Sequence, residues 1–133
     1  MNRINLLILI VFVLLTGCSR QETIRAAGEG EYWKAHMVYE MTNSELSDRG
    51  GIEYTGDEEL NYVTFAVITS TGANRKGERY PEENQTAISF GTSVTNHPPT
   101  KDEAIIDLNH TYIEIKWQTK TGDYEEKVEL KVN

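Results

Sequence analysis

The chain has 133 residues, of which 21 are Asp or Glu and 13 are Lys or Arg, for a formal net charge of −8. This length corresponds to one domain and is too short for a two-lobed solute receptor. A chain this acidic is a poor candidate for binding nucleic acid or anionic lipid through a basic patch.

The first 17 residues are typical of a secretion signal. Arg3 precedes an unbroken apolar run from Leu6 to Leu15, which is too short for the ~20 residues of a spanning helix and fits the apolar part of a signal peptide. Thr16 and Gly17 supply the small residues that a signal peptidase requires before its cut. Removing residues 1–17 leaves 116 residues with 12 basic and 21 acidic side chains, a net charge of −9.

Cys18 is the only cysteine and directly follows this signal. The sequence Leu15-Thr16-Gly17-Cys18 resembles the lipobox of bacterial lipoproteins, in which the cut falls before the Cys and the Cys becomes the lipidated first residue. The resemblance implies a diacylglycerol on Cys18, whose two acyl chains would hold the protein on the extracytoplasmic face of the cell membrane. The alternative is an ordinary signal followed by a free thiol, which is awkward in an exported protein. Without a second cysteine there is no internal disulfide.

Residues 18–31 are expected to form a flexible tether that begins with the lipidated Cys18. The segment is polar, is interrupted by Gly28 and Gly30, and has almost no large apolar side chains with which to order itself. Residues 32–133 are then expected to form a single globular domain.

The first half of this domain shows strand patterns and turn signals. Between Tyr32 and Thr42 apolar and polar residues alternate with a period of two, which predicts a strand. Residues 43–51 carry turn residues, and residues 52–55 are a short strand candidate. Residues 59–70 predict a longer strand that is apolar on both faces and therefore central. Residues 71–85, broken by glycines and a proline, are predicted to be a loop.

The second half carries the clearest pattern. Residues 86–95 predict a strand with a bulge at Gly91, the prolines within 96–100 end it, and residues 102–107 could form a single helical turn. Residues 111–119 and 124–132 alternate strongly on either side of a short turn containing Gly122, which predicts a β-hairpin. Six to seven strands without a substantial helix indicate an all-β fold, an antiparallel immunoglobulin-like β-sandwich.

A family resemblance accompanies this pattern. The stretch Asp102-Glu103-Ala104-Ile105-Ile106, the strand Tyr112–Trp117, the Gly122 turn and the strand Lys127–Lys131 resemble the C-terminal hairpin of small uncharacterised all-β lipoproteins from Bacillus-like bacteria. The Trp33-Lys34 opening is similar too. The shared motifs are structural, so the resemblance implies a fold and an envelope location but no catalytic residue.

The residues that carry chemistry form no recognisable catalytic or metal motif. The three histidines, His36, His97 and His110, stand apart without metal-ligand spacing. Asp57-Glu58-Glu59 lacks the spacing of a calcium loop and is better explained as a solvated turn. No nucleophile elbow or phosphate loop occurs. We expect no catalytic residue, no metal and no cofactor.

The sequence therefore favours a membrane-anchored, non-catalytic binding or accessory module of the cell envelope. Exposed aromatic and loop residues are its candidate contacts, namely Tyr80, Pro81, His97 and Tyr112. The negative charge favours a basic envelope protein or peptide as partner and argues against nucleic acid. One alternative is a protective or inhibitory lipoprotein that sequesters a cationic toxin or hydrolase, and another is a small envelope enzyme such as a hydrolase.

Overall fold

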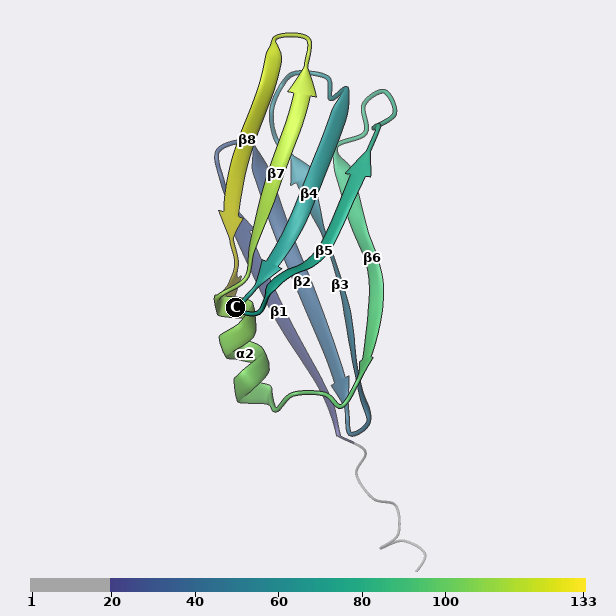
Figure 1. The fold of residues 1–133 in the computed structure, drawn as a ribbon, viewed down its shortest axis with the longest axis vertical. Helices are drawn as coiled ribbons and strands as arrows, with labels where there is room; N and C mark the ends of the chain where they lie inside the picture. Colours follow the sequence, from purple (N-terminus) through teal and green to yellow (C-terminus); the bar gives the residue numbers. More distant parts are fainter. Residues whose placement is uncertain (1–19) are drawn as a thin grey trace, which may run out of the picture.

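A computed structural model describes residues 20–133, so the predicted signal peptide and lipidation site at Cys18 lie outside the described residues. Two antiparallel sheets pack face to face (Figure 1). The five-stranded sheet, sheet A, has the order β6-β3-β2-β1-β9, and the four-stranded sheet, sheet B, has the order β5-β4-β7-β8. The predicted all-β sandwich is confirmed, although the described residues form nine strands rather than six or seven.

The strands run in chain order as β1 (Gln21–Glu29), β2 (Trp33–Thr42), β3 (Glu45–Tyr54), β4 (Tyr62–Thr69), β5 (Gly72–Arg79), β6 (Ala87–Asn96), β7 (Tyr112–Thr119), β8 (Gly122–Glu129) and β9 (Lys131–Val132). Helix α2 (Lys101–Asn109) lies between β6 and β7. The expected central strand is confirmed, because β4 lies between β5 and β7 in sheet B. The expected C-terminal hairpin is confirmed as β7 and β8.

The prediction of a flexible tether is wrong for residues 21–29, which form β1 inside sheet A and pair with β2 along their whole length. Ile24 and Ala26 point into the core and are 4% and 2% exposed. The small residues that suggested a tether serve close packing: a Cβ on Gly28 would collide with the backbone carbonyl of Glu129 at the end of β8. Only Ser19 and Arg20 therefore lie between the predicted lipidation site, Cys18, and the first strand.

Two further segments predicted to be irregular are strands. Residues 45–51 belong to β3, where Gly50 lets the strand approach β2 so closely that a Cβ would meet the His36 carbonyl. Residues 72–79 form β5, an edge strand paired only with β4. Most of the β5 side chains face solvent, so its composition gives no apolar alternation by which to recognise a strand.

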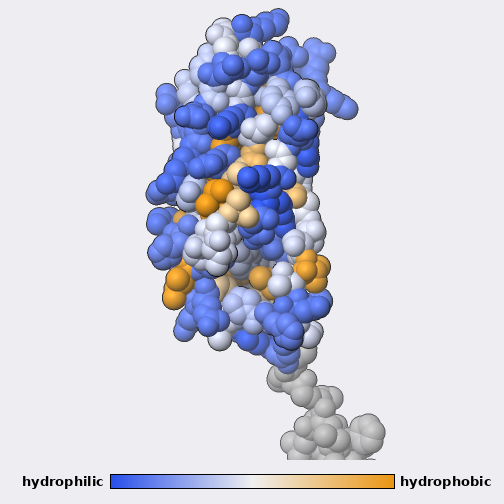
Figure 2. Space-filling view, viewed as in Figure 1, coloured by the Kyte–Doolittle hydropathy of each residue, from blue (hydrophilic) through white to orange (hydrophobic). Residues whose placement is uncertain are grey.

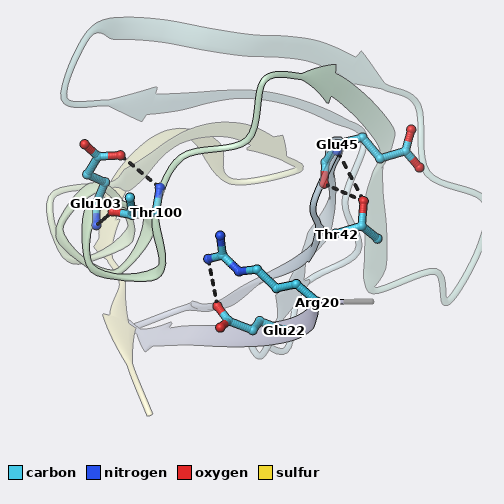
Figure 3. Close-up of polar contacts among 6 residues, drawn as sticks. All are labelled: Arg20, Glu22, Thr42, Glu45, Thr100 and Glu103. Atoms are coloured by element: carbon cyan, nitrogen blue, oxygen red, sulfur yellow. Dashed lines mark hydrogen bonds and ion pairs between the residues drawn. The ribbon is translucent and has the colours of Figure 1, made fainter. Parts of the chain in front are cut away.

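The helical turn expected at 102–107 is a longer helix, α2, with two buried side chains, Ala104 and Leu108. Thr100 caps it: its hydroxyl accepts the Glu103 N–H at 3.2 Å, and the Glu103 carboxylate accepts the Thr100 N–H at 2.9 Å (Figure 3). This reciprocal capping box satisfies two N–H groups that a helix start otherwise leaves open. The helix covers the inner face of sheet A where sheet B ends, and the Tyr39 hydroxyl donates to Asp107 at 3.0 Å.

The domain is elongated, and its two ends differ (Figure 1). At the end where β1 begins, which we call the proximal end, lie the β2–β3 turn and the β6–α2 connection. Figure 3 shows polar contacts there, the Arg20–Glu22 ion pair at 3.1 Å and the bond from the Glu45 N–H to the Thr42 hydroxyl at 3.2 Å. The opposite, distal end carries the β1–β2, β3–β4, β5–β6 and β7–β8 connections.

Candidate functional site at the distal end

Four connections meet at the distal end and are joined by backbone hydrogen bonds. We call them together the distal rim, residues 30–32, 55–61, 80–86 and 120–121. The Thr55 N–H donates to the Tyr32 carbonyl at 2.7 Å, and the Tyr54 N–H donates to the Thr86 carbonyl at 2.9 Å. The β3–β4 connection is thereby fixed to both the β1–β2 turn and the β5–β6 loop, so these connections form one continuous surface.

Two carboxylates fasten the rest of the rim. Glu58 accepts hydrogen bonds from the Thr119 hydroxyl at 3.0 Å and the Thr121 hydroxyl at 2.7 Å, which ties the β3–β4 connection to the β7–β8 turn. Glu126 accepts the N–H groups of Glu31 at 2.6 Å and Tyr32 at 3.1 Å. Glu126 is the one polar residue on the inward face of β8 in the sequence pattern, and its contacts explain this exception.

An aromatic cluster supports the rim from below. Trp33 and Trp117, 0% and 4% exposed, meet edge to face with centroids 5.7 Å apart. Tyr54 packs on both, and Tyr124 stacks on Trp117 at 5.6 Å. Burial and the nearby charge of Glu58 raise the pKa of Tyr54. Such a cluster buries a large apolar area under the connections and makes the distal end a rigid support.

Exposed carboxylates gather where the β3–β4 and β5–β6 connections face each other. A shallow hollow of ≈ 240 Å³ between them is lined by residues 56–60 and 82–86. Asp57, Glu59, Glu82 and Glu83 are exposed there. Within residues 20–133 these four carboxylates take part in no ion pair, and no group of three or more acidic, His or Cys side chains is placed to hold a metal ion. The hollow is a negatively charged surface, and the hydrophilic cover of this end is visible in Figure 2.

Tyr80 begins the β5–β6 connection and is 75% exposed. Its ring lies against that of Tyr62, with centroids 4.8 Å apart. The Tyr62 hydroxyl donates to Glu78 at 2.6 Å, and this hydrogen bond is the main cause that raises the pKa of Tyr62 to about 12. Pro81 follows, half-buried, where the loop leaves β5. The two contact residues predicted in this loop therefore lie at the distal rim.

The other two predicted contact residues lie elsewhere. His97 follows β6 toward the proximal end, where it adopts a positive φ of 63°. Tyr112 begins β7 beside α2 and is half-buried, with the Lys127 ammonium 4.1 Å from its ring centroid. The structure thus brings Tyr80 and Pro81 together and separates them from His97 and Tyr112.

The sequence interpretation missed the convergence of the acidic residues. Asp57–Glu59 is expected from the sequence to be a solvated turn, and Glu82 and Glu83 belong to the loop predicted at residues 71–85, so nothing in the sequence pattern connects the two acidic runs. Their meeting depends on the antiparallel pairing of β3 with β6, which places Glu53 opposite Ala87 and so brings the connection after β3 beside the connection before β6. The shared signal was their position: each acidic run lies in the connection at the same end of a paired strand.

None of the helices in residues 20–133 is long and apolar enough to cross a membrane. Comparison of the chain with protein-family models, with curated proteins and with solved structures found no match.

Proposed function

We propose that this protein is a lipid-anchored, non-catalytic domain of the cell envelope that binds a basic protein or peptide at its distal rim. The observation that carries the proposal is the placement of the two ends. The chain enters the domain at the proximal end, and the rim with its exposed carboxylates is at the opposite end (Figure 1). A domain anchored through Cys18 would present this rim away from the membrane.

The start of β1 sets the distance from the anchor. Gln21 is three residues after Cys18, and three residues span at most about 10 Å. The lipid would therefore hold the proximal end close to the membrane surface, without a long flexible linker between them. Two acyl chains on one cysteine would make this attachment stable, where a single chain gives only marginal binding.

The charge of the rim supports a basic partner. Four exposed carboxylates without ion pairs surround the hollow, in a mature chain of net charge −9. Charges of one sign that are concentrated on a concave surface speed the association of oppositely charged partners and exclude partners of like charge. The exposed ring of Tyr80 adds an aromatic anchor of the kind that contributes strongly to protein interfaces.

The anchor is tested by Cys18→Ala in cells. We expect the wild-type protein in the membrane fraction, with a mass shift that corresponds to a diacylglycerol, and the variant in the soluble fraction. A variant that remains in the membrane fraction would show that the lipobox interpretation is wrong.

The binding surface is tested by neutralising three carboxylates at the rim and, as a control, three exposed carboxylates elsewhere. We compare the triple variant Glu59→Gln, Glu82→Gln and Glu83→Gln with the control Glu114→Gln, Glu125→Gln and Glu129→Gln, which removes the same charge from exposed positions of sheet B. Affinity capture from the host's solubilised envelope should retain a protein of high isoelectric point with the wild type and the control. The rim variant should not retain that protein, and neither should the wild type in about 0.5 M salt, which screens the charges. Equal capture by both triple variants would rule out the rim.

A further inference from the structure

Strand β6 is the one long sheet edge in residues 20–133 that carries no charge. It pairs with β3 on one side and has no strand on the other. None of its residues, Ala87 to Asn96, is charged or a proline. The edge strands of sheet B are rich in charge, in Arg75, Lys76, Glu78 and Arg79 of β5 and in five residues of β8. The far edge of sheet A is the two-residue strand β9. Natural proteins protect free edges by such charges or by short strands, and β6 has neither.

The lower half of β6, residues 92–96, offers free backbone groups. The Tyr54 N–H bonds to the Thr86 carbonyl, so even-numbered residues of β3 direct their backbone groups toward β6. Below the bulge at Gly91 the partners of Asp48 and Leu46 are Ser93 and Thr95. The alternation of an antiparallel strand then turns the N–H and C=O groups of Thr92, Val94 and Asn96 outward.

The space beside this half is open. Val94 is 59% exposed, and Thr95 is exposed although it faces the same side as the buried Leu46. Sheet B ends above this level in Figure 1, and α2 packs at the far edge of sheet A, beside β1 and β9. Side chains meet the β6 backbone at the bulge, where an Arg75 N–H donates to the Gly91 carbonyl at 3.3 Å and the Ser89 hydroxyl accepts the Gly91 N–H at 3.1 Å.

We propose that residues 92–96 of β6 accept an extended segment of another protein as an additional antiparallel strand of sheet A. In such an addition main-chain hydrogen bonds supply affinity and alternate side chains supply specificity. The outward groups of Thr92, Val94 and Asn96 supply the hydrogen bonds. The exposed Val94 offers an apolar or β-branched side chain of the added strand a cross-strand partner.

The geometry disfavours a second copy as the occupant. Two β6 strands that pair about a twofold axis run antiparallel, and β6 follows the long axis of the domain (Figure 1). The two N-terminal ends would therefore point in opposite directions, which two copies anchored upright on one membrane do not allow. This step rests on the proposed lipid anchor, whereas the free edge itself does not.

Charge indicates the composition of the segment. Glu45 lies opposite Asn96 at one end of residues 92–96 and has no ion-pair partner in residues 20–133. Arg49 lies opposite Thr92 at the other end, where it is paired with Glu40 at 2.9 Å. An extended segment with β-branched residues in its middle and a basic residue at the end beside Asn96 would complement this edge.

The test is hydrogen exchange with mass spectrometry on the mature protein, purified from whichever cell fraction holds it. The probe is a peptide of alternating valine and threonine with a lysine at each end, and its counterpart carries glutamate at the ends. We expect the lysine peptide to slow exchange at the amides of Thr92, Val94 and Asn96, and the glutamate peptide to bind more weakly. Val94→Pro, which removes an outward N–H, should weaken binding at least about tenfold, whereas Val94→Thr should leave it within about twofold.

Folding of the variants is read from the same data. Pairing of β3 with β6 should persist in Val94→Pro as protection at Leu46 and Asp48, because an edge strand tolerates proline where the N–H faces outward. If this variant does not fold, Val94→Lys tests the same edge by charge. No protection at residues 92–96 with excess peptide, or protection elsewhere only, would overturn the proposal. Concentration-dependent protection of these amides without peptide would assign the edge to a second copy and overturn the proposed occupant. The cell fraction that holds the protein reports separately on the lipid anchor.

Discussion

Arg75→Ala is the perturbation that tests most sharply how the two sheets are held together. Arg75 of β5 forms an ion pair with Asp48 of β3, and the two side chains are only 16% and 8% exposed. The pair spans sheets A and B where β5 and β6 diverge. Removing the guanidinium would leave a buried carboxylate without its partner, which costs about 3–5 kcal/mol of unfolding free energy. Most domains have only about 5–15 kcal/mol in total.

The assay is urea unfolding followed by the fluorescence of the buried Trp33 and Trp117. Lys76→Ala, on the same strand but exposed, is the matched control and should change the unfolding free energy by less than about 0.5 kcal/mol. The double variant Asp48→Val with Arg75→Leu should be close to wild type, because apolar pairs often replace buried ion pairs without loss. A cost below about 1 kcal/mol for Arg75→Ala would refute the argument that burial makes this pair important.

Three further predictions concern single residues. Gly28→Ala should lower the unfolding free energy by about 1–3 kcal/mol, because its Cβ meets the backbone of β8; a neutral result in urea unfolding would contradict the packing of β1. Glu126→Gln should cost about 1 kcal/mol, since its charge-assisted bonds to two turn N–H groups become neutral; urea unfolding measures this cost. Burial and then the charge of Asp107 raise the pKa of Tyr39 far above its usual value near 10. The protonated phenol therefore contributes stability that is fully present below about pH 10 and is lost as the pH rises further, because the unfolded chain ionises first. Tyr39→Phe should flatten this decline of the unfolding free energy in alkaline solution.

The sequence predicted those strands whose two faces differ in polarity. In β2 and β7 buried and exposed residues alternate, so the period of two in the sequence identified both strands. The face that the sequence predicted to be apolar is the buried face in each of them. Val38 is buried although it lies on the polar face of β2, because it stands between Arg25 and Arg49 in the register, whose long apolar stems can cover it.

Strands β1 and β5 could not be recognised in the same way. In β1 the core positions hold only Ile24 and Ala26 between polar residues, and Gly28 is required by the approach of β8 rather than by flexibility. In β5 the pairing with β4 depends on backbone groups, which are the same in every sequence. Tertiary pairing thus ordered segments whose composition resembled a tether and a loop.

In the candidate site, too, local sequence patterns identified single residues but not the contacts that depend on strand pairing. Tyr80 and Pro81 could be selected as candidate contact residues from their loop composition, and both lie at the distal rim, where Tyr80 is exposed and Pro81 is half-buried. The junction of Asp57–Glu59 with Glu82–Glu83 is a product of strand order, which no local pattern encodes. The free edge of β6 is likewise a property of the sheet, since an uncharged strand looks the same whether it is central or at an edge.

Site-specific photo-crosslinking in cells tests the central claim most directly, because it asks which end of the anchored domain meets a partner. The crosslinking residue replaces either Tyr80 at the distal rim or Ile106 of helix α2 toward the proximal end, both of them exposed. We predict a discrete adduct with a basic protein from position 80, absent from position 106 and reduced when Glu59, Glu82 and Glu83 are neutralised. Adducts of equal yield from both positions, or an adduct from position 106 alone, would contradict the proposal that the distal rim is the binding surface.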